Sequence, residues 1–271
     1  MYTEIVGKQY YFLAGLHRSG NTVLSAVLNQ HPDIYSSPLG PICEYMWLVH
    51  NSSHETTIIN TFEYRKQQLI SSMLDSYYAD VEKPIIIDRE KNWANPANIE
   101  MLKKYFAEKP KIIYTIRPIA EVLASFIAIN SNGLIREMED GSWNQDPNLS
   151  LNDNLCEFLM NPNNQIARNL EAIHSIKNSE NDGMFHIVQY HDFLNSPQKT
   201  MDEIYEFLGI EGFTHNFKNI RKIEEYDDTA AGLPKDLHKI RRQLSKSDVR
   251  VNEYVSEYIQ NKYSYIDDLF E

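Results

Sequence analysis

The stretch from Tyr10 to Leu28, YYFLAGLHRSGNTVLSAVL, constrains the fold more than any other part of the chain. It opens with an apolar and aromatic run, breaks at Gly15, passes through a short polar turn, and resumes with apolar residues at helical spacing. This pattern predicts a strand, a tight loop and a helix. The loop has the G-x-x-x-x-G-x-T frame of a phosphate-binding loop, with Asn21 where a nucleotide triphosphatase needs lysine.

Such a loop can bind a tetrahedral anion without that lysine, because backbone N–H groups and the dipole of the helix N-terminus already attract one. The planar guanidinium of Arg18 can bind two oxygens of the same anion. Ser19 and Thr22 add hydroxyl donors. Without the lysine, the loop lacks part of the lysine and magnesium arrangement that nucleotide triphosphatases use at the γ-phosphate. The loop therefore favours a phosphate or sulfate site over an ATPase, and a plain strand–turn–helix with an incidental glycine pair is the alternative.

Composition narrows the function classes. The chain has 271 residues, enough for one large domain over residues 1–271, and a formal net charge of -12. Such acidity argues against nucleic acid or a long polyanion as partner. Cys43 and Cys156 have no disulfide or zinc spacing, and a turn-forming stretch between His50 and His54 argues against a metal pair, so we expect no metal. No apolar stretch is long enough for a membrane span, and we expect a soluble, cytoplasmic protein.

Three further apolar runs predict buried strands, at residues 84–88, 111–116 and 184–189. Helical patterns separate the strands, so the sequence predicts an α/β fold with a P-loop-like, mostly parallel sheet and helices on both faces. We expect these helices at residues 56–78, 99–106, 118–129, 165–176, 200–208 and 251–259.

Two segments lack a clear pattern of this kind. Residues 34–41 are rich in turn formers and predict a loop. Residues 130–164 are polar and interrupted by glycines and prolines, which predicts a surface excursion or lid.

Charged and polar side chains follow the predicted strands, at the edge where open α/β sheets bind ligands. Asp88, Arg89 and Lys91 follow the second strand, Arg117 the third, and Tyr190 the fourth. With the loop, these positions resemble the family of sulfotransferases that use 3'-phosphoadenosine-5'-phosphosulfate (PAPS). The branch that the chain resembles most is the tyrosylprotein sulfotransferases and their bacterial and phage relatives.

The first motif of the resemblance is residues 16–33, which are similar to the R-S-G-T-T loop and H-P-D turn of that family, with Asn21 in place of a threonine. The resemblance implies that this loop holds the 5'-phosphosulfate, through Arg18, Ser19, Gly20, Asn21 and Thr22.

The second motif is Arg117 with Ser125, eight positions later, which the resemblance assigns to the 3'-phosphate. Tyr190 matches a tyrosine that lies near the adenine in that family. Lys239 belongs to a stretch similar to the segment that closes over the cofactor, and His238 stands where those relatives have serine. Read alone, these are an ordinary helix-start arginine, a serine and a core aromatic.

Sulfuryl transfer is an in-line displacement, so cations and positioning should carry most of its catalysis. We expect Arg18 to supply one cation and Lys91 or Arg89 a second. A base for the acceptor is less clear, because the sequence has Ser36–Gly40 where tyrosylprotein sulfotransferases have a glutamate. Glu44, His17 and Asp88 are the candidates.

The resemblance implies a metal-independent transferase that moves the sulfuryl group of PAPS to a hydroxyl or amine of a small-molecule or peptide acceptor. Two alternatives stay open. One is a nucleotide or small-molecule kinase with a degenerate loop, for which Asn21 is a poor fit. The other is a non-catalytic nucleotide-binding module.

Overall fold

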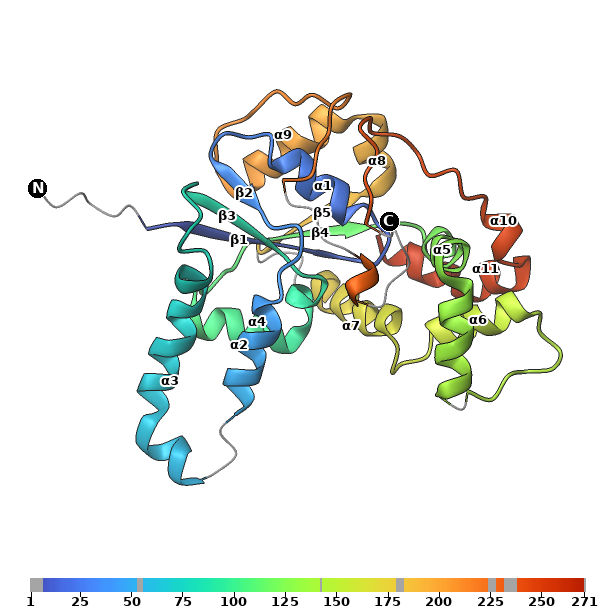
Figure 1. Cartoon of the computed structure of the whole chain (residues 1–271), viewed down its shortest axis with the longest axis horizontal. Helices are drawn as coiled ribbons and strands as arrows, with labels where there is room; N and C mark the ends of the chain where they lie inside the picture. Colours follow the sequence, from blue (N-terminus) through green and yellow to red (C-terminus); the bar gives the residue numbers. More distant parts are fainter. Residues whose placement is uncertain are drawn as a thin grey trace, which may run out of the picture.

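The centre of the fold is a five-stranded parallel sheet with strand order β2-β3-β1-β4-β5 (Figure 1). The computed structural model describes residues 7–52, 56–141, 143–178, 183–223, 228–231 and 238–270. The strands are β1 (Gln9–Gly15), β2 (Ile34–Ser36), β3 (Ile85–Arg89), β4 (Ile112–Ile116) and β5 (Phe185–Gln189). The predicted α/β fold with a parallel sheet is confirmed.

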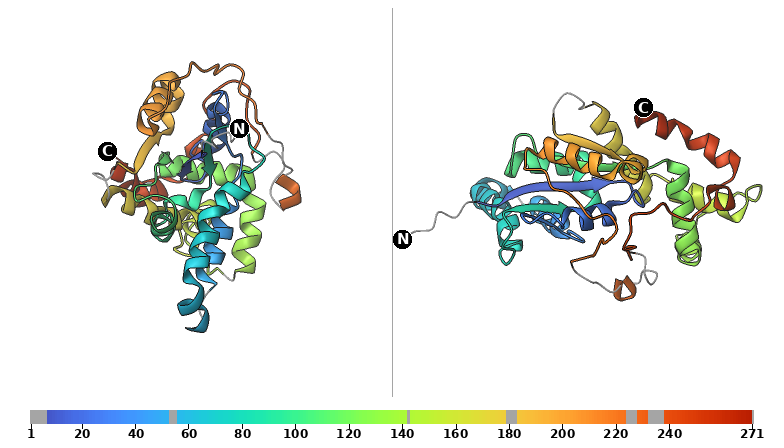
Figure 2. Two further views of the ribbon diagram at one scale, coloured as in Figure 1. Left: turned by 90° about the vertical axis from the view of Figure 1, so that its left-hand side faces the viewer. Right: turned by 90° about the horizontal axis from the view of Figure 1, so that it is seen from above.

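Helices cover both faces of this sheet, which explains why the strand sequences are continuously apolar. Phe12 and Ala14 of β1 belong to one core cluster, and Leu13 between them belongs to the other. On the Leu13 face lie α1 (Asn21–Leu28), α8 (Tyr190–Asn195) and α9 (Pro197–Leu208). The other helices lie on the opposite face or beyond the sheet edge, and α2 and α3 project away from it (Figures 1 and 2).

The remaining elements have the following bounds: α2 (Ile42–Asn51), α3 (Thr56–Tyr77), η1 (Lys91–Ala94), α4 (Pro96–Tyr105), α5 (Ile119–Asp140), α6 (Leu151–Leu159), α7 (Gln165–Asn178), η2 (Asp228–Ala231), α10 (Val251–Tyr254), α11 (Glu257–Tyr263) and η3 (Ser264–Phe270).

The register of the sheet brings three strand ends together. Leu13 of β1 pairs with Arg89 of β3, and Gly15 pairs with Thr115 of β4. The loop that follows β1 therefore lies between the polar residues at the carboxyl ends of β3 and β4, where open α/β sheets bind ligands.

The prediction of a loop over residues 34–41 is wrong at its start. Residues 34–36 form the edge strand β2, in which Ile34 pairs with Ile85. Three residues are too few for a periodic pattern to appear, and neighbouring turn formers conceal the strand.

The prediction of a polar surface excursion over residues 130–164 is also wrong in part. The helix expected to end near Ile129 continues as α5 to Asp140, with a kink at Asn130, and α6 follows. Six apolar side chains from this segment are buried in the main core: Leu134, Met138, Leu155, Cys156, Leu159 and Met160. These side chains are adjacent or four positions apart on their helices, with polar residues between them. The segment is polar on average, so its composition does not reveal the buried helix faces. Movement of this segment as a lid stays a prediction.

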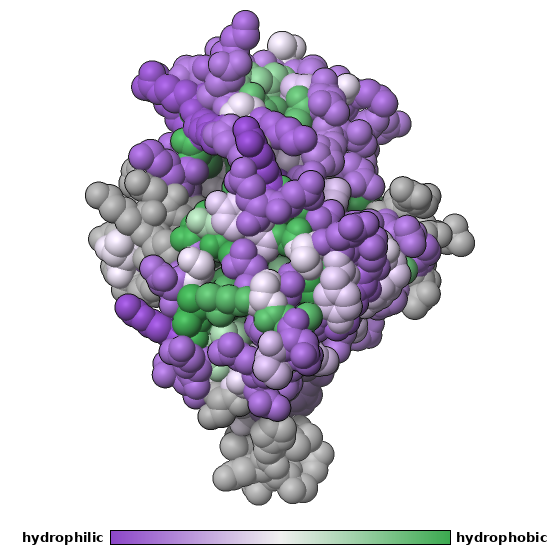
Figure 3. Space-filling view, turned by 90° about the vertical axis from the view of Figure 1, so that its right-hand side faces the viewer, coloured by the Kyte–Doolittle hydropathy of each residue, from purple (hydrophilic) through white to green (hydrophobic). Residues whose placement is uncertain are grey.

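The end of the molecule formed by α5, α6, α10 and α11 presents mainly hydrophilic side chains around small, separate hydrophobic patches (Figure 3). The single terminal helix expected over residues 251–259 is instead two helices. Val255 adopts an extended backbone between α10 and α11, and the Ser256 side chain accepts a hydrogen bond from the Ile259 N–H to cap α11.

Within the part of the chain that the structure describes, every helix is too short or too polar to cross a lipid bilayer. A single domain over residues 1–271 and a cytoplasmic location stay predictions.

Gly15 allows the closest approach of β1 to β4, and its replacement tests this packing. A Cβ at Gly15 would lie 2.3 Å from Thr115 Oγ1, and its φ of +143° is rarely adopted by L-residues. We expect Gly15→Ala to lower the free energy of unfolding by about 3 kcal/mol or more. Gly212→Ala is the control, because no atom lies within 4 Å of its Cβ. Urea unfolding measures both, and equal midpoints for Gly15→Ala and wild type would contradict the packing.

Candidate anion-binding and catalytic site

The loop between β1 and α1 contains two residues with left-handed backbone conformations. Arg18 has a φ of 59° and Gly20, which caps α1, has a φ of 95°. Successive N–H groups in such a turn form a concave anion site at the positive end of the helix dipole. This local structure is the one that the glycine spacing predicts.

The side chains of Ser19 and Asn21 face the protein interior and brace the loop. Ser19 Oγ lies 2.5 Å from both the Leu16 carbonyl oxygen and Thr115 Oγ1. Asn21 Nδ2 donates to the Leu16 carbonyl at 3.3 Å, and Asn21 Oδ1 accepts from Thr115 Oγ1 at 2.9 Å. Both residues are buried, so their backbone N–H groups, and not their side chains, are the groups placed to bind an anion.

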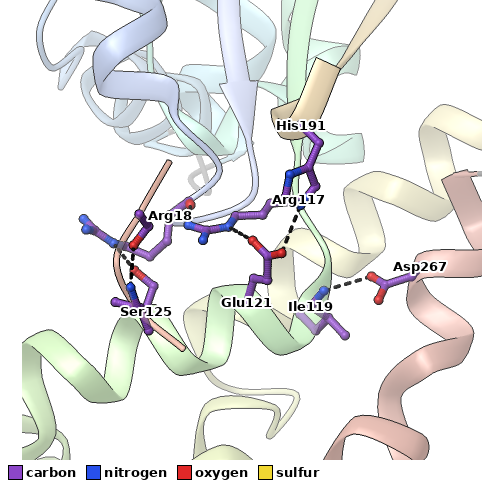
Figure 4. A network of polar contacts seen from close by, with 9 residues as sticks. Arg18, Arg117, Ile119, Glu121, Ser125, His191 and Asp267 are labelled. Carbon is purple, nitrogen blue, oxygen red and sulfur yellow. Dashed lines mark hydrogen bonds and ion pairs between the residues drawn. The ribbon is translucent and has the colours of Figure 1, made fainter. Parts of the chain in front are cut away.

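Arg18 connects the loop to α5. Its Nε donates to Ser125 Oγ at 3.2 Å, and its carbonyl oxygen accepts from Arg117 Nη1 at 3.0 Å (Figure 4). Ser125 therefore contacts Arg18 directly. The shared role of Ser125 and Arg117 at a 3'-phosphate, which the resemblance implies, stays a prediction. Burial, together with the like charge of Arg117, lowers the pKa of Arg18.

Arg117 is held on three sides. Its Nε donates to Glu121 Oε2 at 2.8 Å, and its guanidinium carbon lies 4.3 Å from the centroid of the Tyr190 ring. Glu121 Oε1 lies 2.9 Å from His191 Nε2 on α8, so a chain of polar groups runs from α8 to the loop (Figure 4). Burial raises the pKa of Glu121, but hydrogen bonds and charges from Arg117 and His191 outweigh it and hold that pKa below its usual value.

Tyr190 also contacts the loop directly. A Cβ placed at Gly20 would lie 3.1 Å from Tyr190 Cδ2, so the ring packs against that glycine. The absence of a side chain at Gly20 permits both this contact and the left-handed turn.

Two more cations lie at the end of β3. Arg89 is buried, and its Nη1 donates to Thr22 Oγ1 at 3.3 Å. Lys91, in η1, lies with its Nζ 2.7 Å from His17 Nε2. Burial lowers the pKa of Lys91. The two cations predicted at this strand end, Arg89 and Lys91, therefore both contact residues of the phosphate-binding loop motif.

The ring of His17 is fixed through both of its nitrogens. Nε2 faces Lys91, and Nδ1 lies 2.9 Å from the side-chain amide of Asn169 on α7. With Lys91 donating to Nε2, the proton of the neutral ring is on Nδ1, and Asn169 can accept it through its amide oxygen. In the opposite orientation, with the amide nitrogen of Asn169 facing His17, the amide oxygen is buried without a hydrogen-bond donor among the described residues.

The candidate base Asp88 is fully buried and fully engaged. It accepts from Trp93 Nε1 at 2.6 Å and from the Tyr78 hydroxyl, and the backbone of Gly40 packs on it. Burial raises the pKa of Asp88 to about 6. The third candidate, Glu44, is exposed in the first turn of α2.

The C-terminal part of the chain adds a pair of side chains, of which the sequence indicated His238 and not Asp228. Asp228 of η2 accepts from the backbone N–H of His238 at 2.9 Å, and its other oxygen lies 2.6 Å from His238 Nδ1. The charge of Asp228 acts on Arg18, and the charges of Arg89 and Arg18 act on His238. Lys239 is exposed beside this pair, and Leu237 lies outside the described residues.

Four of these groups were not predicted from the sequence. Glu121, one helical turn after Arg117, is the easiest to anticipate, since i, i+4 ion pairs are common in helices. His191, Asn169 and Asp228 approach the site from distant segments, and only the folded chain brings them there.

The comparison with protein families agrees with this geometry. A family model described as the sulfotransferase family matches residues 11–215. The chain belongs to the sulfotransferase family. Among the described residues there is no group of three or more histidine, cysteine or carboxylate side chains that could hold a metal ion, and no curated protein sequence matches the chain.

Solved sulfotransferases share the fold of this family member. The sulfotransferase domain from the curacin biosynthetic pathway is similar with a TM-score of 0.62 and 15% identity, over 96% of this chain and 98% of that domain. Mouse sulfotransferase SULT7A1, solved with 3'-phosphoadenosine 5'-phosphate (PAP), is similar with a TM-score of 0.53 and 17% identity, over 97% of this chain and 82% of that protein. A sulfotransferase from Alicyclobacillus acidocaldarius has a TM-score of 0.51 and 13% identity, over 97% of this chain and 95% of that protein. The predicted resemblance to sulfotransferases is confirmed, while the roles of individual residues stay predictions.

The raised pKa of Asp88 predicts a specific pH dependence of stability. The folded pKa of about 6 lies above the unfolded value of 3.8, so the folded state binds more protons between these values. The stability of wild type relative to Asp88→Asn should fall by about 2 kcal/mol as the pH rises from 4 to 7. Urea unfolding of both proteins across this range measures the difference, and a constant difference would show that Asp88 does not titrate in the folded protein.

Proposed function

We propose that this sulfotransferase takes its sulfuryl group from PAPS and delivers it to a hydroxyl or amine acceptor. The observation that carries the proposal is a cluster of buried or partly buried cations at one helix N-terminus, in a chain of net charge -12. The cluster consists of Arg18, Arg89, Lys91 and Arg117. Glu121 pairs with Arg117, and the charges of Asp228 and Glu90 act on Arg18 and Lys91. A multiply charged anion would stabilise these partly desolvated cations further.

The donor has phosphate groups at two ends, and the site has two corresponding regions. The 5'-phosphosulfate would accept from the backbone N–H groups of residues 19–22 and from Arg18. The 3'-phosphate would lie at Ser125 and at Arg117, whose Nε and Nη1 already bind Glu121 and the Arg18 carbonyl, so Nη2 is its expected donor. Tyr190, packed on the loop and on Arg117, offers an aromatic surface beside both regions.

In the transfer, the acceptor oxygen or nitrogen attacks sulfur and the bond from sulfur to the bridging oxygen breaks. The electron pair of that bond leaves with PAP. Arg18 and the loop N–H groups would stabilise charge on the leaving and equatorial oxygens, with Lys91 and Arg89 on the β3 side. These fixed cations supply the charge that magnesium supplies in phosphoryl transfer, and the proposal needs no metal.

The acceptor is a small molecule or a peptide, and the surface near the site supports an apolar or aromatic one. Leu39, Tyr45 and Leu48 are exposed on α2 and on the segment before it. This segment adjoins the end of β3, because Ser37 Oγ accepts from the Arg89 N–H at 2.8 Å. A kinase and a non-catalytic nucleotide-binding module are the alternatives that the experiment below must separate.

Calorimetry of nucleotide binding tests the donor. In the absence of magnesium, we expect PAP to bind more tightly than ATP, because only PAP places a phosphate at Arg117. Arg117→Ala should weaken PAP binding about 10- to 100-fold by removing a charge-assisted hydrogen bond. Arg136→Ala, an exposed position on the same helix, removes the same charge and should leave the affinity unchanged.

Each alternative predicts a different result. Tighter ATP binding that depends on added magnesium would support the kinase and contradict the PAPS proposal. Selective PAP binding without consumption of PAPS by any acceptor, or by water, would favour a binding module.

A further inference from the structure

Transfer to a hydroxyl is helped by a group that takes the proton of the acceptor, and the three candidates from the sequence fit this role poorly. Glu44 is exposed to solvent. Asp88 is fully buried and holds hydrogen bonds from Trp93 and Tyr78 on its two oxygens. Protonating His17 at Nε2 would place two cations in contact, because Lys91 Nζ is 2.7 Å away. The base must be sought elsewhere at the site.

Asp228 and His238 form a pair with the geometry of a positioned base. The carboxylate of Asp228 is 6% exposed and holds His238 twice, through the backbone N–H at 2.9 Å and through Nδ1 at 2.6 Å. Two contacts from one carboxylate fix both the position and the tautomer of the ring. The proton lies on Nδ1, and the lone pair of the neutral imidazole lies on Nε2.

The pair lies near the cations that would hold the sulfuryl group. His238 interacts electrostatically with Arg89 and Arg18, and Asp228 interacts with Arg18 and Lys222. Arg89 in turn donates to Thr22 at the start of α1. These interactions support a position of His238 near the loop, and its side chain is 23% exposed.

The surroundings of His238 keep its ring neutral. Burial lowers its pKa, the Asp228 carboxylate raises it, and the charges of Arg89 and Arg18 lower it again, with a net value below that of free histidine. At neutral pH the ring is therefore deprotonated, as a general base must be.

We propose that His238 is the general base of the sulfuryl transfer and that Asp228 positions its ring. This inference rests on the proposed function. As the acceptor oxygen forms its bond to sulfur, Nε2 takes the hydroxyl proton, and the electron pair of the breaking sulfur–oxygen bond leaves with PAP. The imidazolium then releases its proton to solvent, so the ring is regenerated without a co-reactant.

Nuclear magnetic resonance of the full chain with labelled histidine tests the geometry without any acceptor. His238→Gln identifies the His238 signals by their loss. We expect the neutral ring in the form with the proton on Nδ1, a pKa below that of free histidine, and a chemical-shift change when PAP is added. An Nε2-protonated ring, or signals unaffected by bound PAP, would overturn the proposal.

Kinetics tests the chemistry, with conversion of PAPS to PAP followed in the presence of 2-naphthol, tyramine or water alone as acceptor. We expect His238→Gln to lower kcat about 10²- to 10⁴-fold with PAP affinity unchanged within about twofold. His174→Gln, an exposed histidine on α7, is the matched control and should match wild type.

Asp228→Asn supplies a measurement that a purely structural role would not change. Loss of the carboxylate removes the charge that raises the pKa of His238, so the acid limb of the kcat profile should move to lower pH while the plateau falls. Wild-type turnover in His238→Gln would overturn the proposal and leave the proposed function intact. Failure of the wild type to bind PAP would instead contradict the proposed function. If no acceptor is converted, the tautomer of His238 and its chemical-shift response to PAP decide whether the proposal holds.

Discussion

The hydrogen bond from Arg117 Nη1 to the carbonyl oxygen of Arg18 is the contact on which the geometry of the site depends. It joins the end of β4 to the loop after β1 at the residue whose backbone is left-handed, with a φ of 59°. A non-glycine residue in that conformation is strained by about 1 kcal/mol or more and persists only where its surroundings hold it. Arg117 is itself held by Glu121 and Tyr190. The direction of the loop N–H groups is therefore set by α5 and α8 as well as by the loop.

The same arrangement explains how an acidic chain can present a strongly positive site. The chain has 38 carboxylate side chains and 26 lysine and arginine side chains, but four of these cations, Arg18, Arg89, Lys91 and Arg117, gather at the loop. Burial lowers the pKa values of Arg18 and Lys91. These side chains have lost much of their hydration before any ligand arrives. Charges fixed in this way need little reorganisation when negative charge develops near them, which is the condition for electrostatic catalysis. The general acidity of the surface then disfavours long polyanions without weakening a small, enclosed anion site.

The sequence predicted the sheet and the loop well because each has a local physical cause. Continuous apolar runs mark strands with two buried faces, and paired glycines mark a tight turn before a helix. Prediction from the sequence failed where an element is stabilised by residues far away in the chain, or where polar neighbours mask a buried helix face. β2 is stabilised by β3 and is only three residues long, and the inward faces of α5 and α6 are hidden by polar neighbours. The partners of His17 and His238, and the contact between Arg18 and Ser125, follow from tertiary packing alone.

The replacement of the P-loop lysine by Asn21 has a structural consequence that bears on the choice between sulfuryl and phosphoryl transfer. Asn21 is turned inward, where it binds the Leu16 carbonyl and Thr115. Thr22, which follows it, is the position whose hydroxyl binds magnesium in nucleotide triphosphatases. Here that hydroxyl accepts a hydrogen bond from Arg89. A guanidinium at this position repels a divalent cation and occupies one of the two lone pairs of the hydroxyl, whereas it attracts the oxygens of an anion such as a phosphosulfate. Residues 21 and 22 together therefore favour an anion held by fixed protein cations over one held through magnesium.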